Sequence, residues 1–295
     1  MSFAGSIVAM TTPWNDDLSN IDYGAVKDLV EWHIASGTDG IVPAGSTGES
    51  ATLSHQEQGE LIAKTVEFAA GRLKILAGAG SNRTDEAVSL AKAAKAAGAD
   101  GILVITPYYN RPTPEGQYRH FGAIAEQCDL PMVIYNVPSR TGTNMLPDTI
   151  IRIARSFPTI KGIKEASGII DQAGQIIDQL GDSFEVISGD DSLTVPMMSI
   201  GGRGVISVIA NVAPAEVKAM TAAALAGDFA KAREWHYKLL PLMKACFIET
   251  NPGPVKTALS MLGRIRANLR LPLVEPQPEC RQAITDAMRK AGLVQ

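Results

Sequence analysis

Residues that cross-link chains or bind metals are scarce in this sequence. Only three cysteines occur in 295 residues, and the four histidines form neither an HExxH motif nor a cluster. A sparse, odd set of cysteines without CxxC spacing is neither a disulfide framework nor a zinc site. We therefore expect no catalytic metal and a reducing compartment, the cytoplasm. These residues are Cys128, Cys246, Cys280, His33, His55, His120 and His236.

Long hydrophobic runs and an excess of one charge are also absent. No stretch of about 18 apolar residues occurs, so no membrane span is expected. Met1–Met10 lacks the basic start and the long apolar core of a signal peptide. The net charge is −4 without a long run of one sign, which argues against a nucleic-acid surface and a basic membrane helix. The composition is that of a soluble globular protein.

Short apolar runs, most of them containing Ile or Val, recur along most of the chain. Each is too short for a helix, and they recur about every 30 residues, the length of one strand–crossover–strand unit. The runs are Ser6–Met10, Gly40–Pro43, Lys74–Ala77, Gly101–Ile105, Met132–Tyr135, Ile160–Lys164, Glu185–Ser188 and Gly204–Val208. Helical spacing lies between them, as in Tyr23–Ser36, His55–Ala70, Thr84–Ala97 and Leu146–Ser156.

This alternation predicts an α/β protein whose parallel strands close into a (β/α)8 TIM barrel. An open doubly wound sheet is the alternative, but no GxGxxG fingerprint follows the first strand. After about Leu225 the spacing is helical only, and the Pro-rich Leu271–Pro278 precedes a last helix over about Glu279–Lys290. We expect a catalytic barrel over residues 1–224 and a C-terminal helical extension over residues 225–295.

Polar and reactive side chains follow the predicted strands. In a (β/α)8 barrel the active site lies at the carboxyl ends of the strands, so these residues are expected to share one rim. Several reactive segments on one rim are stronger evidence for an active site than any single motif. The segments are Gly45–Glu49, Thr106–Asn110, Tyr135–Gly142, Lys164–Glu165 and Ser188–Asp191.

Lys164 is the first candidate for chemistry. Side chains alternate along a strand, so Ile160, Gly162 and Lys164 are expected on one face and Lys161 on the other. An amine among apolar walls has a lowered pKa and is a nucleophile. The alternative is a structural lysine paired with a carboxylate such as Glu165, and spacing alone supports both interpretations about equally.

Hydroxyl groups near the same rim are candidates for proton transfer. Imine formation needs a group that gives and accepts protons as water leaves, and Tyr135, Tyr109 and Ser46 carry suitable hydroxyls. The glycine-flanked Ser46–Thr47 turn offers backbone N–H groups to a carboxylate, and Arg140 offers a bidentate contact to a second one. Taken singly, each has a plain structural alternative, namely a packed ring, a tight turn or a surface arginine.

Together the motifs resemble those of the dihydrodipicolinate synthase / N-acetylneuraminate lyase family, in the same order and over nearly the whole chain. The set is Gly-Ser-Thr-Gly-Glu (45–49), Thr-Pro-Tyr-Tyr-Asn (106–110), Tyr-Asn-Val-Pro (135–138) and Gly-Ile-Lys-Glu (162–165). Ser-Arg-Thr-Gly (139–142), Ser-Gly-Asp-Asp (188–191) and Asn-Pro-Gly-Pro-Val-Lys (251–256) are similar to the 4-hydroxy-tetrahydrodipicolinate synthase branch. One position departs: Ser46 stands where that branch usually has threonine, although serine keeps the hydroxyl.

The resemblance implies a class I lyase without metal or organic cofactor. It would condense pyruvate with L-aspartate 4-semialdehyde to 4-hydroxy-tetrahydrodipicolinate, toward diaminopimelate and lysine. The implied residues are the Schiff-base Lys164; the proton relay Tyr135, Ser46 and Tyr109; the pyruvate-binding Thr47, Gly189 and Ile206 backbone; and Arg140 for the semialdehyde carboxylate. Two alternatives stay open: an aldolase or dehydratase for a longer 2-oxo sugar acid, as in N-acetylneuraminate lyase, and a barrel that binds a 2-oxo acid without turnover.

The resemblance also implies a homotetramer built as a dimer of dimers. In that family the tyrosine matching Tyr109 reaches into the partner's site across a tight dimer. Some members are inhibited by L-lysine bound at this interface. The matching positions here are Ser50, Ala51, His55, Asn82, Glu86 and Tyr108, and Gln58 replaces a second histidine found in some of them.

Overall fold

Strands and helices alternate through most of the chain. The computed structural model describes residues 2–295. The strands are β1 (Gly5–Ala9), β2 (Gly40–Val42), β3 (Lys74–Gly78), β4 (Gly101–Ile105), β5 (Met132–Asn136), β6 (Ile160–Glu165), β7 (Glu185–Ser188) and β8 (Gly204–Ser207). They are parallel and pair in sequence order from β1 to β8, and β8 pairs with β1, so the barrel is closed. The predicted (β/α)8 barrel is confirmed.

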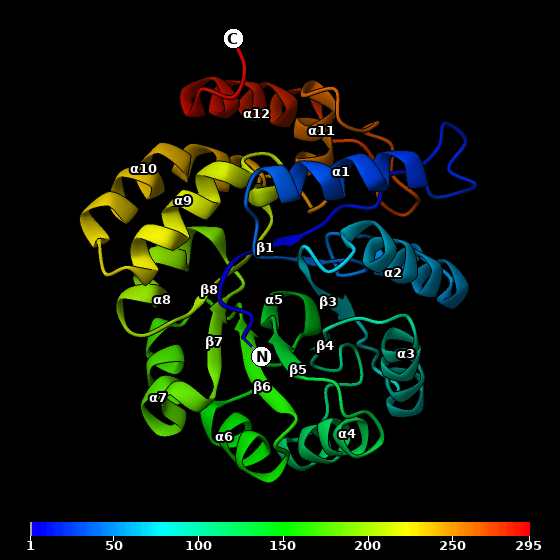
Figure 1. Ribbon diagram of the computed structural model, residues 1–295, viewed down its shortest axis with the longest axis vertical. Coiled ribbons are helices and arrows are strands. Elements are labelled where there is room, and N and C mark those ends of the chain that lie inside the picture. Colours follow the sequence, from blue (N-terminus) through cyan, green and yellow to red (C-terminus); the bar gives the residue numbers. More distant parts are fainter. Residues whose placement is uncertain (1) are drawn as a thin grey trace.

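Helices surround the barrel and extend it at one side (Figure 1). The α-helices are α1 (Tyr23–Ala35), α2 (His55–Ala69), α3 (Thr84–Ala96), α4 (Pro114–Gln127), α5 (Pro138–Thr141), α6 (Pro147–Ser156), α7 (Ile170–Leu180), α8 (Thr194–Ser199), α9 (Pro214–Leu225), α10 (Phe229–Ala245), α11 (Gly253–Met261) and α12 (Pro278–Ala291). Short 3-10 helices are η1 (Ser50–Thr52), η2 (Gly181–Ser183), η3 (Asp191–Leu193) and η4 (Ile209–Asn211). Within residues 2–295, no helix has both the length and the apolar character needed to cross a membrane.

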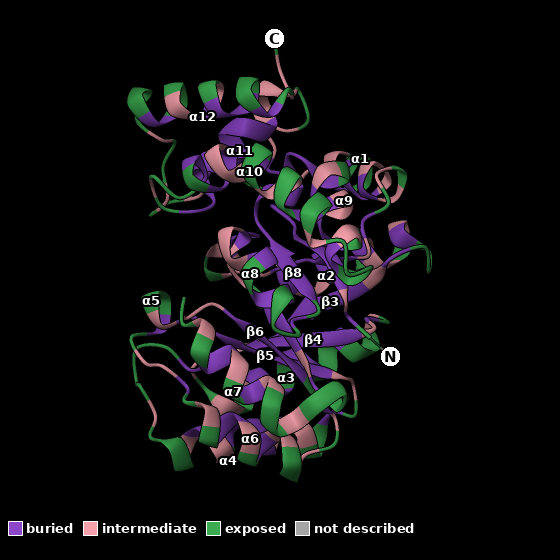
Figure 2. Cartoon of the chain, turned by 90° about the vertical axis from the view of Figure 1, so that its left-hand side faces the viewer, coloured by how far each residue is buried: buried purple, intermediate pink, exposed green. Residues whose placement is uncertain are grey.

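Alternating strand residues build two separate apolar clusters. Ile7 and Ala9 of β1 belong to the cluster inside the barrel, whereas Val8 belongs to the cluster between strands and helices. Figure 2 shows the strands largely buried and most of the surrounding helices with one buried and one exposed side. Because both faces of each strand are covered, the strands are continuous apolar runs rather than alternating ones.

In β6 the alternation of side chains between the two faces of the strand is interrupted. Between Met132 and Val133 the pairing register of β5 and β6 shifts, so that Lys161 is an extra residue on β6. Ile160 therefore packs in the cluster between strands and helices, and the prediction that it shares a face with Gly162 and Lys164 is wrong. Such a bulge inserts one residue and changes the side-chain alternation beyond it.

Lys161 was expected on the face of β6 opposite Lys164, and it does not share the interior of the barrel with that lysine. It is exposed and lines a cavity with Ser2, Glu185 and Arg203, near the first residues of β7 and β8. The amino end of the barrel therefore carries Lys161, and the carboxyl end carries Lys164. The two lysines are separated along the strand even though they are three positions apart in sequence.

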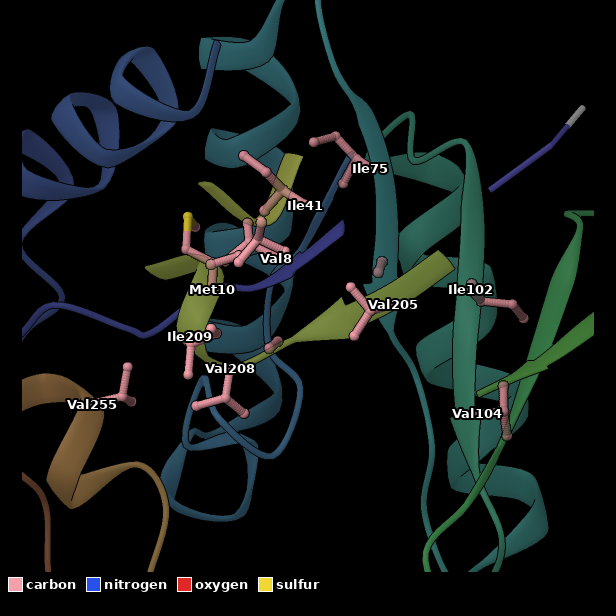
Figure 3. Packing of buried hydrophobic residues seen from close by; sticks show 14 of the residues in the cluster. Val8, Met10, Ile41, Ile75, Ile102, Val104, Val205, Val208, Ile209 and Val255 are labelled. Carbon is pink, nitrogen blue, oxygen red and sulfur yellow. The ribbon is translucent and has the colours of Figure 1, made fainter. Parts of the chain in front are cut away.

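The helices after Leu225 pack on the barrel. Helix α10 packs against α9 and α12, and α11 packs against η4 and α12. Figure 3 shows Val255 of α11 beside Ile209 of η4, and both belong to the cluster outside the barrel. The last helix, predicted over about Glu279–Lys290, is observed as α12 with one more residue at each end. A division at residue 225 remains a proposal, and it falls where α9 ends.

Candidate active site

Lys164 lies inside the barrel near the carboxyl end of β6. It pairs with Tyr135 of β5 and with Ile187 of β7, and only 6% of its surface is exposed. Its Nζ atom lies 4.2 Å from the centroid of the Tyr135 ring. A cavity of about 240 Å³ opens above it and is lined by Lys164, Tyr135, Ser46, Thr47 and Arg140 among others.

The environment of Lys164 favours a neutral amine. Burial lowers its pKa from the ordinary 10.5 to about 7; the negative charge of Asp191 opposes this shift, and the positive charge of Arg140 adds to it. At neutral pH a substantial fraction of the side chain is therefore unprotonated and able to attack a carbonyl carbon.

The alternative of a structural pair with Glu165 is not what the structure shows. Glu165 is buried and accepts hydrogen bonds from Asn136 Nδ2 (3.1 Å), Gln172 Nε2 (3.2 Å) and the backbone N–H of Ser167 (2.6 Å). Its oxygens are engaged on the helix side of the strand, which leaves the Lys164 amine free.

Tyr135 and Ser46 lie together beside the lysine. Burial raises the pKa of the Tyr135 hydroxyl, while Arg140 and a hydrogen bond involving Ser46 lower it in part. The phenol is thus protonated at neutral pH and has a second hydroxyl with which to exchange a proton. Two of the three hydroxyls expected in the relay are therefore in place within one chain.

The turn that carries Ser46 and Thr47 presents donors to the cavity. Within residues 2–295, the backbone N–H groups of Ser46 and Thr47 donate to no other protein group. Unpaired N–H groups on adjacent residues of a turn form an anion-binding concavity. Arg140 of α5 lines the same cavity, and its guanidinium donates to the Asn251 carbonyl at 3.1 Å.

Gly189 and Ile206 lie at the ends of β7 and β8 near the lysine. A Cβ atom on Gly189 would lie 3.0 Å from Lys164 Cε and 2.6 Å from Ala166 Cβ, so only glycine allows this close approach. Ile206 is fully buried in the cluster inside the barrel with Tyr135 and Ile187. Gly189 also lines a cavity with Lys164, whereas Ile206 packs in the apolar cluster below it and lines no described cavity of residues 2–295.

Tyr109 is the one candidate of the relay that lies outside this site. Its side chain is 90% exposed, and its backbone has a left-handed φ of 67°, which is uncommon for a residue other than glycine. The neighbouring Tyr108 is 39% exposed and lines the cavity that contains Lys164. Within a single chain, then, Tyr108 reaches the site and Tyr109 does not.

The positions that the resemblance implied for an effector fall into two groups. Ser50, Ala51 and Tyr108 line the same cavity as Lys164. His55 Nε2 lies 2.7 Å from Glu86 Oε1, and the Asn82 carbonyl accepts a hydrogen bond from Asn110 Nδ2 at 2.8 Å. Gln58 is buried and donates to the Gly78 carbonyl at 2.8 Å, so it serves as a structural contact.

Comparison with known proteins agrees with this geometry. The model of the dihydrodipicolinate synthetase family matches residues 2–291. The chain belongs to this family. It is 50% identical to the 4-hydroxy-tetrahydrodipicolinate synthase of Nitratidesulfovibrio vulgaris (strain Miyazaki F), covering 100% of both chains.

Solved structures of dihydrodipicolinate synthases have the same fold. That from Acinetobacter baumannii, chloride inhibited and complexed with pyruvate, has 43% identity and a TM-score of 0.97, covering 99% of this chain and 100% of the other. That from Cyanidioschyzon merolae, with lysine bound, has 39% identity and a TM-score of 0.96, covering 99% of each.

Two residues of this dihydrodipicolinate synthetase family member contribute to the site without having been assigned a role from sequence. Asn251 donates from Nδ2 to the Thr47 hydroxyl at 2.9 Å. Asp191, named from sequence only as the end of a rim segment, is buried and accepts from the backbone N–H groups of Val208 (3.0 Å) and Ile209 (3.2 Å). Their positions in short motifs were visible in the sequence, but their partners were not.

Burial of the Lys164 amine should reduce stability in a pH-dependent way. Its pKa is about 7 in the folded chain and about 10.5 in the unfolded chain, so the unfolded chain binds more protons between these values and stability rises with pH there. We expect Lys164→Met to stabilise the fold most below pH 7 and progressively less toward pH 10. Denaturant unfolding at about pH 6 and about pH 9 measures this difference.

Lys161→Met is the matched control, because Lys161 is exposed on the same strand and its removal should change stability by less than about 0.5 kcal/mol at either pH. A gain from Lys164→Met that is equal at both pH values would contradict a depressed pKa for Lys164.

Proposed function

We propose that this chain is a 4-hydroxy-tetrahydrodipicolinate synthase, which joins pyruvate to L-aspartate 4-semialdehyde through a Schiff base on Lys164. The observation that carries the proposal is the buried Lys164 amine, whose pKa is lowered to about 7, in contact with the Tyr135 ring inside a cavity. The names of the curated relatives support the same activity. A cytoplasmic location is part of this proposal.

Pyruvate would be bound through its carboxylate at the Ser46–Thr47 turn, whose N–H groups have no protein partner among residues 2–295. The neutral Lys164 amine then attacks the keto carbon, and the Tyr135 hydroxyl, with Ser46 beside it, transfers protons while the carbinolamine loses water. The protonated imine withdraws electrons, so a proton leaves the methyl group of pyruvate. The resulting enamine carbon attacks the aldehyde carbon, which forms the new carbon–carbon bond.

Arg140 supports aspartate semialdehyde as the second substrate. Its guanidinium lines the two cavities that also contain Lys164 and Tyr135, and a guanidinium binds a carboxylate with two parallel hydrogen bonds. A semialdehyde with its own carboxylate therefore has a cationic partner in the same cavity, separate from the N–H groups of the Ser46–Thr47 turn. An aldolase for longer 2-oxo sugar acids remains the alternative enzyme, and a barrel that binds without turnover remains the non-catalytic one.

Borohydride reduction in the presence of pyruvate should attach a pyruvyl group to Lys164 and leave Lys161 unlabelled. Peptide mapping identifies the labelled residue, and turnover with aspartate semialdehyde distinguishes a synthase from a sugar-acid aldolase. Arg140→Ala should keep pyruvate labelling but weaken use of the aldehyde by about 2–3 kcal/mol, the value of a charge-assisted contact.

Three results would count against these assignments. Label on another lysine, or no label, would exclude the imine mechanism. Unchanged aldehyde kinetics in Arg140→Ala would remove its role, and efficient cleavage of N-acetylneuraminate by the wild type would favour the alternative enzyme.

We further propose that the active unit is a dimer in which Tyr109 completes the relay of a second copy, and that two dimers form a tetramer. The exposed aromatic ring and the left-handed backbone of Tyr109 support this, because aromatic residues are enriched at interface centres. Asn110, the next residue, is tied to Asn82 at 2.8 Å, which holds the loop in an outward position.

Mixing Tyr109→Phe with Lys164→Ala protein under conditions of subunit exchange should restore activity, because some mixed dimers contain one intact composite site. Each variant alone should be strongly impaired. Sedimentation of the wild type gives the assembly state, and a fully active monomer would refute a shared site.

L-lysine is proposed as an effector that binds where Ser50, Ala51 and Tyr108 meet the His55–Glu86 pair. The lysine-bound structure of the Cyanidioschyzon merolae relative supports the choice of ligand, and the Glu86 carboxylate is suited to bind an amino group. Allostery requires the ligand to bind one state of the enzyme more tightly than another.

We expect L-lysine to inhibit partially and to inhibit less in Glu86→Ala. Initial rates and melting temperature, measured with and without millimolar lysine, provide the test, and Glu67→Ala on the exposed end of α2 is a control that should behave as wild type. If lysine alters neither quantity in the wild type, these residues are interface contacts only.

A further inference from the structure

Two residues at the ends of family motifs, Glu49 and Lys256, form a buried ion pair that the proposed chemistry does not use. The Lys256 ammonium lies 2.6 Å from Glu49 Oε1, and neither side chain is exposed to solvent. The two residues are 207 positions apart in sequence. Glu49 ends the segment that carries Ser46 and Thr47, whereas Lys256 lies on α11 of the C-terminal extension.

Both charges are satisfied by further hydrogen bonds. Lys256 Nζ also donates to the Thr12 carbonyl at 2.9 Å. Glu49 accepts from Trp14 Nε1 at 3.1 Å and from the backbone N–H of Arg270 at 3.3 Å. A buried pair is costly to desolvate and is tolerated only when the remaining donors and acceptors are paired in this way. Removal of one partner would leave the other charge uncompensated.

Residues of the same network, Glu49 and Thr12, also hold the backbone of the Ser46–Thr47 turn. Glu49 adopts a left-handed φ of 58° and its N–H donates to the Ser46 carbonyl at 3.2 Å. The Thr12 hydroxyl donates to the Gly48 carbonyl at 2.6 Å. A left-handed non-glycine residue is strained and persists when its surroundings hold it in place. The Glu49 side chain, anchored on Lys256, is the nearest such restraint.

A second link joins the C-terminal segment to the same turn. Asn251 donates from Nδ2 to the Thr47 hydroxyl at 2.9 Å, and its own carbonyl accepts from Arg140. The segment 251–256 therefore bonds to two residues that line the cavity, Thr47 and Arg140. Val255 between these contacts is fully buried against the barrel, in the cluster that Figure 3 shows around η4.

We propose that Glu49 and Lys256 are positioning residues for catalysis: their buried ion pair holds the Ser46–Thr47 turn at the correct place opposite Lys164, so that the C-terminal extension is part of the catalytic site. This inference rests on the proposed function of that site. Neither residue touches the substrate. Their effect on the reaction is exerted through the N–H groups and hydroxyls of Ser46 and Thr47, which bind pyruvate and pass protons.

A purely structural role for the pair predicts a different outcome. Breaking the pair would then lower stability but leave the site unchanged in molecules that fold. The double variant Glu49→Gln/Lys256→Met separates the two roles, because it removes both charges at nearly constant volume and leaves no unpaired ion. Its melting temperature should exceed that of Lys256→Met. If the pair positions the turn, its kinetics should nevertheless remain impaired.

The expected result is a KM for pyruvate raised by about tenfold to a hundredfold in the double variant, with a matching fall in the rate of borohydride labelling. The label should still map to Lys164, because β6 is unchanged. Glu49→Asp keeps both charges and shortens the link by one methylene group, so it should fold and show a smaller change of the same kind. Lys218→Met is the control, since its partner Asp39 precedes β2 at the amino end of the barrel, and it should change only stability.

Wild-type KM and labelling rate in the double variant, or in Glu49→Asp if the double variant does not fold, would overturn the proposal and leave the pair a structural contact. Failure of the proposed function looks different, because the wild type itself would then acquire no label at Lys164. The measurements on wild type and variants therefore distinguish the two failures.

Discussion

The desolvated amine of Lys164 is the constraint on which the rest of the site depends. A lysine is useful as a nucleophile only when unprotonated, and burial inside the barrel lowers its pKa to about 7. Apolar walls are needed for this, and the closed barrel supplies them from strands on all sides. Glycine at position 189 leaves space beside the lysine, because a Cβ atom there would lie 3.0 Å from Lys164 Cε.

Buried carboxylates near the site are kept away from this amine. A carboxylate bonded directly to Lys164 would raise its pKa and quench its reactivity. Glu165 is instead bound by amide donors, and Asp191 by the Ser207 hydroxyl and the backbone N–H groups of Val208 and Ile209. Burial raises the pKa of Asp191 to about 6, and its negative charge opposes only in part the lowering of the Lys164 pKa by burial. The acidic groups thus fix strand ends while Lys164 remains the reactive group.

The site is assembled from segments far apart in the chain. The Ser46–Thr47 turn follows β2, Tyr135 ends β5, and Asn251 comes from the segment before α11. This arrangement explains why a helical extension outside the barrel is bonded so closely to the catalytic rim. Tyr109 lies outside this assembly within the single chain, where its side chain is 90% exposed.

The sequence by itself determined the barrel and most of the rim. Short apolar runs and helical spacing are local patterns, and strands β4 and β7 begin and end where those patterns predicted. The motifs after the strands were also local, and barrel closure brings Lys164, Tyr135 and Ser46 together. Local patterns could not decide whether Lys164 is a reactive amine or a structural partner of Glu165, because the spacing was equally compatible with both.

Only the tertiary structure decided the bulge at Lys161, the partners of Asp191 and Asn251, and the pair of Glu49 with Lys256. The bulge depends on the register between β5 and β6, which no residue of β6 specifies alone. Glu49 and Lys256 are 207 positions apart, and each is an ordinary charged residue in its own segment. Burial and pairing are properties of the packed chain, because the free energy of a charge depends on which groups surround it in space rather than on its neighbours in sequence.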